Sequence, residues 1–156
     1  QLSVESLGFG GADMDAELIN WQEYSHARKE LGDAFVRILG YFREDGIRSV
    51  DAIEQAMRSR DSVGLVIPAH TLKGESRQFG AKLIGDMAET IEVTARRCVE
   101  TREGPEELIE IVADLRGRFD ETLRALEEGV SPLVTQKRAV FGRKGAGTVS
   151  IFGQEG

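Results

Sequence analysis

Residues 61–81 read DSVGLVIPAHTLKGESRQFGA and contain the pattern that decides the fold. Small or apolar residues recur there at alternating spacings of four and three, which is one face of an α-helix. The face consists of Leu65, Ala69, Leu72, Ser76 and Phe79. Asp61 or Ser62 is suited to cap the start of this helix, and Gly80 is suited to end it. The segment therefore predicts an amphipathic helix that buries one face in a core.

A proline, Pro68, lies inside this helical pattern. Proline removes one helical hydrogen bond, and its ring crowds the residue four positions earlier. That residue is Gly64, which has no side chain and so eases the crowding. We therefore expect Pro68 to bend the helix without breaking it.

Two more helices are predicted upstream. Asn20 with Glu23 is a capping-box pattern for a short helix from Trp21 to about Leu31, which Gly32 would end. The next helix is expected to start from a cap at Asp33 and to reach about residue 57. Glycines at positions 40 and 46 weaken this helix, and we expect a kink or a break near residues 45–46.

Two further helices are predicted downstream, over residues 82–101 and from Pro105 to a stop at Gly129. Four long amphipathic helices joined by short loops favour an all-α fold, an antiparallel up-down four-helix bundle over residues 20–130. The short helix at residues 21–31 would cover one end of this bundle.

The two ends of the chain differ from the bundle in composition. Residues 1–19 are expected to form a flexible lead-in rich in Gly and Ser. Residues 131–156 form a Gly-rich tail with four basic residues against one acidic residue. Two interpretations of this tail stay open: a mobile extension, and a β-hairpin of Val140-Phe141 with residues 148–152, packed on the bundle or on a neighbouring chain.

The composition is that of a soluble globular domain. The chain has 156 residues, of which 40% are hydrophobic and 30% charged. A net charge of −7 argues against nucleic acid and anionic membranes as partners, and no apolar run approaches the ~18 residues of a membrane span. A single cysteine, Cys98, fits a reducing cytoplasm. Two histidines and one cysteine do not supply a structural zinc site, so we expect no metal in this chain.

One histidine stands in surroundings that suggest chemistry. His70 follows the core position Ala69 and shares an outward stripe with Val66, Lys73, Gly74 and Arg77. Lys73 is placed to stabilise an anion on the imidazole. Glycine is costly inside a helix, so Gly74 would be explained if another molecule comes close to the ring there. This combination suggests phosphoryl transfer on His70, whereas His26 has no such neighbours and is interpreted as an ordinary surface residue.

The same segment resembles the histidine-containing phosphotransfer (HPt) domains of two-component phosphorelays. Their motif has the form A-H-x-L-K-G-x-S-x-x-[hydrophobic]-G, and residues 69–80 match it position by position. Glu75 stands where a small residue is common in the family, and Phe79 where Leu is common. The resemblance in helical layout covers about residues 19–128.

The resemblance implies a role for each matching residue. The family's phosphorylated histidine falls on His70, its charge-stabilising lysine on Lys73, and the glycine that clears space for the receiver domain on Gly74. In several members a Gln or Glu on the next helix holds Nδ1 of the histidine, and Glu92 stands at that position, followed by a basic residue at Arg96. An alternative interpretation of Glu92 and Arg96 is a solvated ion pair one helical turn apart.

The resemblance also implies a mechanism and partners. With Nδ1 held by Glu92, Nε2 of His70 would attack a phosphoaspartate on the receiver domain of a response regulator or hybrid sensor kinase. The receiver would bring the Mg²⁺, so this chain needs no cofactor of its own and, without a kinase segment, is a carrier and not an enzyme that uses ATP.

The expected docking face lies on the second and third predicted helices, which start at Asp33 and at Asp61 or Ser62. Val66, Ile67 and Gly74 would be in contact, with Arg77 at the rim. Ordinary packing against a neighbouring helix is the alternative for Val66 and Ile67. We expect a cytoplasmic monomer. The alternative function is a helical-bundle interaction module without phosphoryl transfer.

Overall fold

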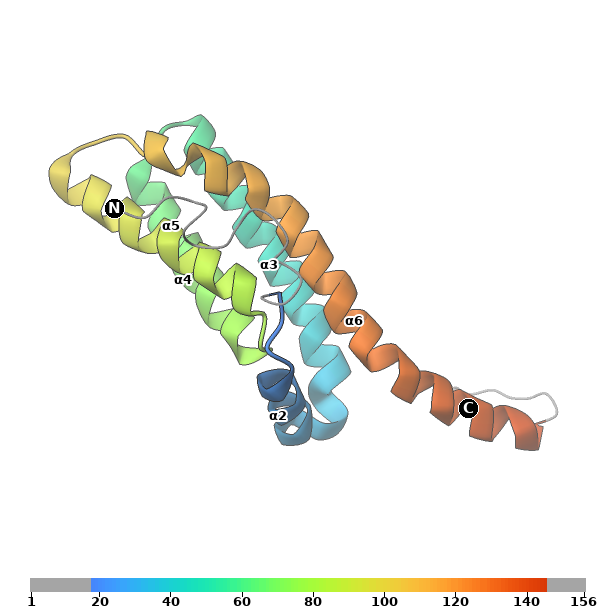
Figure 1. Ribbon diagram of the computed structural model, residues 1–156. Coiled ribbons are helices and arrows are strands. Elements are labelled where there is room, and N and C mark those ends of the chain that lie inside the picture. The colour runs from blue at the N-terminus through green and yellow to red at the C-terminus, as the bar shows by residue number, and fades with distance from the viewer. Residues whose placement is uncertain (1–17, 146–156) are drawn as a thin grey trace. The chain divides into compact units, whose positions relative to one another are not determined.

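The computed structural model describes the backbone of residues 18–145 and the side chains of residues 18–130. Every regular element in this range is helical, as Figure 1 shows, which confirms the predicted all-α fold. The elements are α2 (Trp21–Leu31), the 3₁₀ turn η2 (Gly32–Ala34), α3 (Phe35–Arg58), α4 (Ser62–Gln78), α5 (Lys82–Thr101), the 3₁₀ turn η3 (Glu106–Leu108) and α6 (Ile109–Gly145).

The first part of α6 completes an antiparallel bundle with α3, α4 and α5 (Figure 1). Helix α4 packs against both α3 and α5. Helix α6 packs against α3, where the ring of Phe119 lies edge-on to that of Phe42 with centroids 5.6 Å apart. Arg116 of α6 also pairs with Asp51 and Glu54 of α3. The chain divides into two compact units after Leu123, and the second, from Arg124, is helical to Gly145.

The core is formed by the inward faces of these helices. The predicted face of α4 is buried, with Leu65, Ala69, Leu72 and Ser76 inaccessible to solvent. Aromatic rings link the helices from Tyr24 through Phe35 and Phe79 to Phe42. Burial of these side chains is the main force that holds the helices together.

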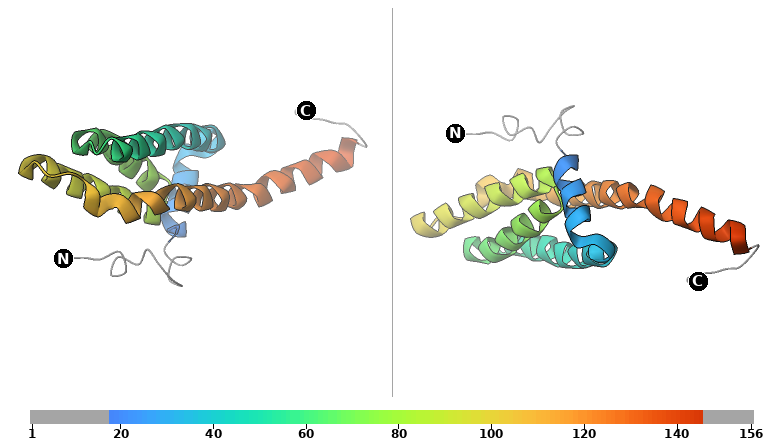
Figure 2. Two further views of the ribbon diagram at one scale, coloured as in Figure 1. Left: turned by 90° about the horizontal axis from the view of Figure 1, so that it is seen from above. Right: turned by 90° about the horizontal axis from the view of Figure 1, so that it is seen from below.

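Glycine 80 joins the short helix α2 to the bundle. Its φ of +75° lies in the left-handed region, and a Cβ there would be 2.6 Å from the carbonyl oxygen of Asn20. The amide of Asn20 donates to the carbonyl of Gly80 at 2.7 Å, while the Asn20 side chain caps α2 by accepting from Gln22 and Glu23 amides. As a result α2 lies across the ends of α3 and α4 (Figure 2).

Helix α4 is continuous through Pro68, as predicted. The carboxylate of Asp61 accepts from the amide of Gly64 at 3.0 Å and so caps the helix. A Cβ on Gly64 would lie 2.6 Å from that carboxylate. Glycine at position 64 therefore leaves room for the carboxylate of Asp61 at the cap, and it also eases the crowding by the ring of Pro68.

The structure corrects three sequence predictions about where helices start and where they are interrupted. Asp33 does not cap α3, because the chain passes from Gly32 through η2 directly into the helix, and the Phe35 amide bonds to the Gly32 carbonyl. The helix does not break at residues 45–46, because α3 is continuous and Gly46 packs against the ring of Phe119 within it. Pro105 precedes a 3₁₀ turn, so the α-helical hydrogen bonds begin only at Ile109.

The predicted stop at Gly129 is also wrong, because α6 continues to Gly145. The residues between Pro132 and Gly142 contain no further helix breaker and include good helix formers such as Leu, Gln, Lys, Arg and Ala. Val140 and Phe141, expected in one strand of a hairpin, are therefore helical. Its other strand, residues 148–152, and the lead-in before Leu18 lie outside the described residues.

Candidate functional site

The predicted reactive histidine lies on the outer side of α4. Its neighbour Ala69 is fully buried, whereas 59% of the His70 side chain is exposed. Nδ1 of His70 lies 2.9 Å from Oε2 of Glu92 on α5. A carboxylate only accepts hydrogen bonds, so Nδ1 carries the proton and donates it. Nε2 is then the nitrogen with the lone pair, and no described residue hydrogen-bonds to it.

Glu92 is a buried carboxylate with three basic neighbours. Its side chain is 6% exposed. Besides His70, Oε2 accepts from Nε and Nη2 of Arg96 at 3.1 and 2.8 Å, and Oε1 lies 2.9 Å from Nζ of Lys73. Burial by itself would raise the pKa of Glu92, but the contacts with Lys73, Arg96 and His70 together lower this pKa to about 2. Glu92 is therefore ionised at neutral pH.

The short turn between α4 and α5 explains why these residues meet. His70 lies 11 residues before Ala81, and Glu92 lies 11 residues after it. Two antiparallel helices joined by a tight turn bring such equidistant positions side by side. The same symmetry relates Arg77, four residues before Ala81, to Gly85, four residues after it. A Cβ on Gly85 would lie 3.0 Å from Cγ of Arg77, so the arginine crosses α5 at this glycine.

Gly74 leaves open space one turn after His70. A Cβ built on this residue would have no atom within 4 Å. No packing requirement of the bundle therefore accounts for glycine at this position. The space above Gly74 is accessible from solvent and adjoins the imidazole.

The other predicted contact residues on α4 differ in exposure and in polar contacts. Ile67 is exposed and Val66 is half-buried. Arg77 pairs with Asp86 and Glu89 of α5, and the hydrogen bond to Glu89 raises its pKa further. Sequence reasoning missed two exposed apolar side chains nearby, Val63 on α4 and Val93, which follows Glu92. A signal was available, because Val63 precedes Ile67 by four residues, Ile67 precedes His70 by three, and all three share one helical stripe.

The docking face was expected between α3 and α4, but the polar contacts of the site lead to α5. His70, Lys73 and Arg77 all pair with carboxylates of α5. On the other side of α4, Glu75 lies near Asp45 of α3, and burial together with this second carboxylate raises the pKa of Glu75. The candidate site is therefore the exposed face of α4 and α5.

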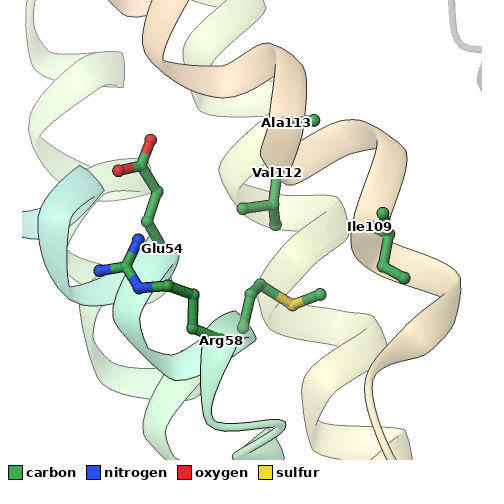
Figure 3. A pocket seen from close by; sticks show the side chains of 6 residues that line it. Glu54, Arg58, Ile109, Val112 and Ala113 are labelled. Carbon is green, nitrogen blue, oxygen red and sulfur yellow. The ribbon is translucent and has the colours of Figure 1, made fainter.

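Other features of the described residues lie apart from this face. His26 is exposed on α2 and lies 3.5 Å from Glu30, one helical turn away, which agrees with an ordinary surface residue. A shallow pocket of about 290 Å³ lies between α3 and α6 (Figure 3). Its lining residues are Glu54, Met57, Arg58, Ile109, Val112 and Ala113, and none of them belongs to α4 or α5.

Residues 18–130 contain no group of three or more His, Cys, Asp or Glu side chains arranged to hold a metal ion. None of the helices described here combines the length and the apolar character that a bilayer span requires.

Comparisons with known proteins bear on the fold and the family of this chain. No curated protein matches the chain. A solved structure described as the HPT domain from the Hpt sensor hybrid histidine kinase from Shewanella matches with a TM-score of 0.62 and 17% identity. The match covers 74% of this chain and 96% of that chain, and at this identity it shows a shared fold. Residues 37–129, more than half of the sequence, match the family model of the Hpt domain. The chain therefore belongs to the Hpt domain family.

Proposed function

We propose that the histidine phosphotransfer of this Hpt domain takes place on Nε2 of His70, which carries the phosphoryl group between receiver-domain aspartates. The observation that supports this most strongly is the hydrogen bond from Nδ1 to the buried carboxylate of Glu92. It fixes the tautomer in which Nε2 holds the lone pair, on an exposed ring. The motif at residues 69–80 surrounds the same ring.

The transfer step follows from this geometry. Nε2 of His70 uses its lone pair to form a bond to phosphorus, and the bond from phosphorus to the aspartyl oxygen breaks with its electron pair on that oxygen. The receiver recovers a carboxylate. The imidazole, protonated on Nδ1, gains a positive charge, which the negative charge of Glu92 compensates. Such transfers proceed through a loose transition state, so catalysis depends mainly on positioning and charge stabilisation.

Lys73 is proposed to stabilise the charge of the phosphoryl group. It lies one turn after His70, and its ammonium group is held 2.9 Å from Oε1 of Glu92. A flexible ammonium with several donors can keep contact with Glu92 and approach an anion on Nε2. Gly74 is proposed to leave room for the receiver, because no atom occupies the space above it.

The partner is proposed to be a receiver domain of a response regulator or hybrid kinase. Val66, Ile67 and Gly74 would contact it, with Arg77 and Arg96 at the rim, and the exposed Val63 and Val93 extend this contact surface. We also propose that Mg²⁺ is bound by the receiver, since the charged groups around His70 other than Glu92 are basic. The protein would act in the cytoplasm as a monomeric carrier with no cofactor of its own.

A transfer assay tests the proposal. A panel of receiver domains, each labelled with radioactive phosphate on its aspartate, is mixed with the full chain and Mg²⁺. We expect label to move to the chain and to resist alkali but not acid, which is typical of phosphohistidine. His26→Gln is the matched control and should accept label at the wild-type rate.

One outcome would favour the alternative function. If receivers that exchange phosphate with another Hpt domain bind this chain but never label it, the protein is an interaction module without phosphoryl transfer. A light-scattering measurement of the free chain checks the proposed monomer, and a dimer at working concentration would contradict it.

A further inference from the structure

Either a glutamate or a glutamine could accept a hydrogen bond from Nδ1 of His70 at position 92. This chain has a glutamate there. Oε2 is fixed by His70 from α4 and by Arg96 from its own helix, and Oε1 lies beside Lys73. Both oxygens are thus in contact with donors, and the side chain is buried. A carboxylate held in this way accepts hydrogen bonds and cannot donate one.

This restriction matters once the ring is phosphorylated. With phosphorus on Nε2, the neutral ring has a lone pair on Nδ1, whereas the protonated ring has an N–H there. A lone pair on Nδ1 would face Oε2, which is also an acceptor, at 2.9 Å. Oε2, a buried charged oxygen, would then lose the hydrogen bond that it accepts from Nδ1. An N–H facing Oε2 keeps the hydrogen bond and adds an opposite charge. A glutamine could serve either ring, because its amide offers an acceptor and a donor.

The protonation state of the ring decides how easily the phosphoryl group leaves. During onward transfer the Nε2–P bond breaks and its electron pair stays on Nε2, while an oxygen of the acceptor bonds to phosphorus. If Nδ1 keeps its proton, the ring leaves as neutral imidazole. If Nδ1 has no proton, the ring must leave as an imidazolate anion, which is a far poorer leaving group.

We infer that Glu92 keeps the phosphorylated imidazole of His70 protonated on Nδ1, which makes the phosphoryl group quick to leave and short-lived. The inference rests on the proposed function, because it requires phosphate on His70. The acceptor is either a receiver carboxylate or water, and when water is the acceptor its proton goes to solvent. Glu92 and Arg96 act here as positioning residues, since neither bonds to the phosphoryl group.

The charges around the ring determine whether Nδ1 of the phosphorylated imidazole keeps its proton. Lys73 from α4 and Arg96 from α5 contact Glu92, and both oppose a positive charge on the imidazole. They also hold the carboxylate ionised, with a pKa of about 2. The carboxylate of Glu92 contacts Nδ1 directly, whereas Lys73 and Arg96 contact Glu92 and not the ring. The attraction between the carboxylate and the ring proton therefore acts over the shorter distance. We therefore expect the net effect to favour the protonated ring.

The experiment follows the loss of phosphate from three versions of the full chain. Wild type, Glu92→Gln and the control Glu89→Gln are labelled with phosphoramidate, freed of the reagent, and followed by phosphorus NMR between about pH 6 and about pH 9. Glu89→Gln removes the same charge one turn earlier on α5, from a side chain that pairs with Arg77 and not with His70.

We expect the phosphohistidine of Glu92→Gln to outlast that of wild type and the control several-fold at the alkaline end. The rate of loss should be nearly independent of pH in wild type and should fall with rising pH in the variant. A purely structural role for Glu92 would not change the shape of the pH profile. Equal lifetimes and parallel profiles would overturn the inference.

A second measurement needs no variant. Nitrogen NMR of wild type with ¹⁵N-labelled histidine reports directly whether Nδ1 of phosphorylated His70 carries a proton at about pH 8. A protonated Nδ1 supports the inference, and an unprotonated one overturns it even if Glu92→Gln fails to fold. If wild type acquires no phosphate on His70, the proposed function fails instead, so the two failures are distinguishable.

Discussion

Two glycines inside helices of this bundle occupy opposite surroundings. At Gly74 on α4, an added Cβ would have no atom within 4 Å. At Gly46 on α3, an added Cβ would lie 2.3 Å from the ring of Phe119. Both positions sacrifice helix propensity relative to alanine. Only Gly46 has a reason for this within the bundle, because α3 and α6 pack closely there.

The difference separates the part of the sequence that builds the bundle from the part that serves a partner. Gly46 is buried, and the ring beside it is almost fully buried. Gly74 is exposed beside His70, and the reason we propose for glycine there is access for a receiver domain. Substitutions at Gly46 and Gly74 should therefore affect different measurements, stability for the first and phosphoryl transfer for the second.

The largest effect is expected for His70→Gln, which removes the group to which Gly74 gives access. Phosphate acceptance should be lost completely, because the other histidine, His26, pairs with the exposed Glu30 and not with a buried carboxylate. The helical content should not change, since the ring is exposed and outside the core. Radiolabel transfer and far-ultraviolet circular dichroism measure the two quantities. Acceptance at the wild-type rate would move the site elsewhere, with His26 as the next candidate.

Gly74→Gln should separate transfer from stability. A side chain standing above α4 would hold the receiver away from Nε2, and a displacement of that size slows transfer by roughly 10- to 100-fold. The same change should raise the free energy of unfolding by up to ~1 kcal/mol, because Gln is the better helix former.

Gly117→Gln on α6 is the matched control, because this glycine is also helical and exposed, with no atom within 4 Å of an added Cβ. It should give the same gain in stability with transfer unchanged. Equal transfer rates for wild type and Gly74→Gln would remove the functional explanation of Gly74.

Gly46→Ala should give the reverse result. The added methyl group must displace the ring of Phe119, which packs against Phe42. Overpacking of this kind costs about 1–3 kcal/mol and outweighs the gain in helix propensity. Urea unfolding measures the loss, while the folded fraction should accept phosphate at the wild-type rate. An unchanged or raised stability would show that the α3–α6 contact is looser than the structure indicates.

The last prediction concerns acid stability. The folded-state pKa of Glu92, about 2, lies below its usual value of 4.5, so its stabilising contribution is present above about pH 4.5 and lost as the pH falls toward 2. The unfolding free energies of wild type and Glu92→Gln should differ by up to about 3 kcal/mol at neutral pH and converge near pH 2. A difference that does not depend on pH would contradict the ionised, paired state of Glu92.

Much of the fold could be predicted because each long helix has a continuous apolar stripe. The bounds of α5 agree with the prediction, and its inward positions Leu83, Met87 and Ile91 are buried. Helix ends and interruptions predicted from single residues were less reliable. Gly46 was interpreted as a weak point and Gly129 as a stop. Instead, Gly46 packs against Phe119, and α6 continues past Gly129 into a stretch with good helix formers from Leu133 onward.

The candidate site could be predicted from the motif at residues 69–80 and from the resemblance it carries. What the sequence did not show was which way the outer face of α4 is turned. The contact of Arg77 with Asp86 and Glu89 depends on how α4 and α5 cross, and this placed the site toward α5 and not toward α3. The exposure of Val63 and Val93 likewise depends on packing, because an apolar side chain on a helix is expected to be buried.

The central claim is that His70 is the residue that carries the phosphoryl group. The most direct test labels the wild-type chain from a phosphorylated receiver, cleaves it at neutral to alkaline pH, where phosphohistidine survives, and maps the phosphate by mass spectrometry. We predict a single phosphate on the peptide that contains His70, with the peptide that contains His26 unmodified. Phosphate on His26, or on a serine or an aspartate with His70 unmodified, would contradict the account.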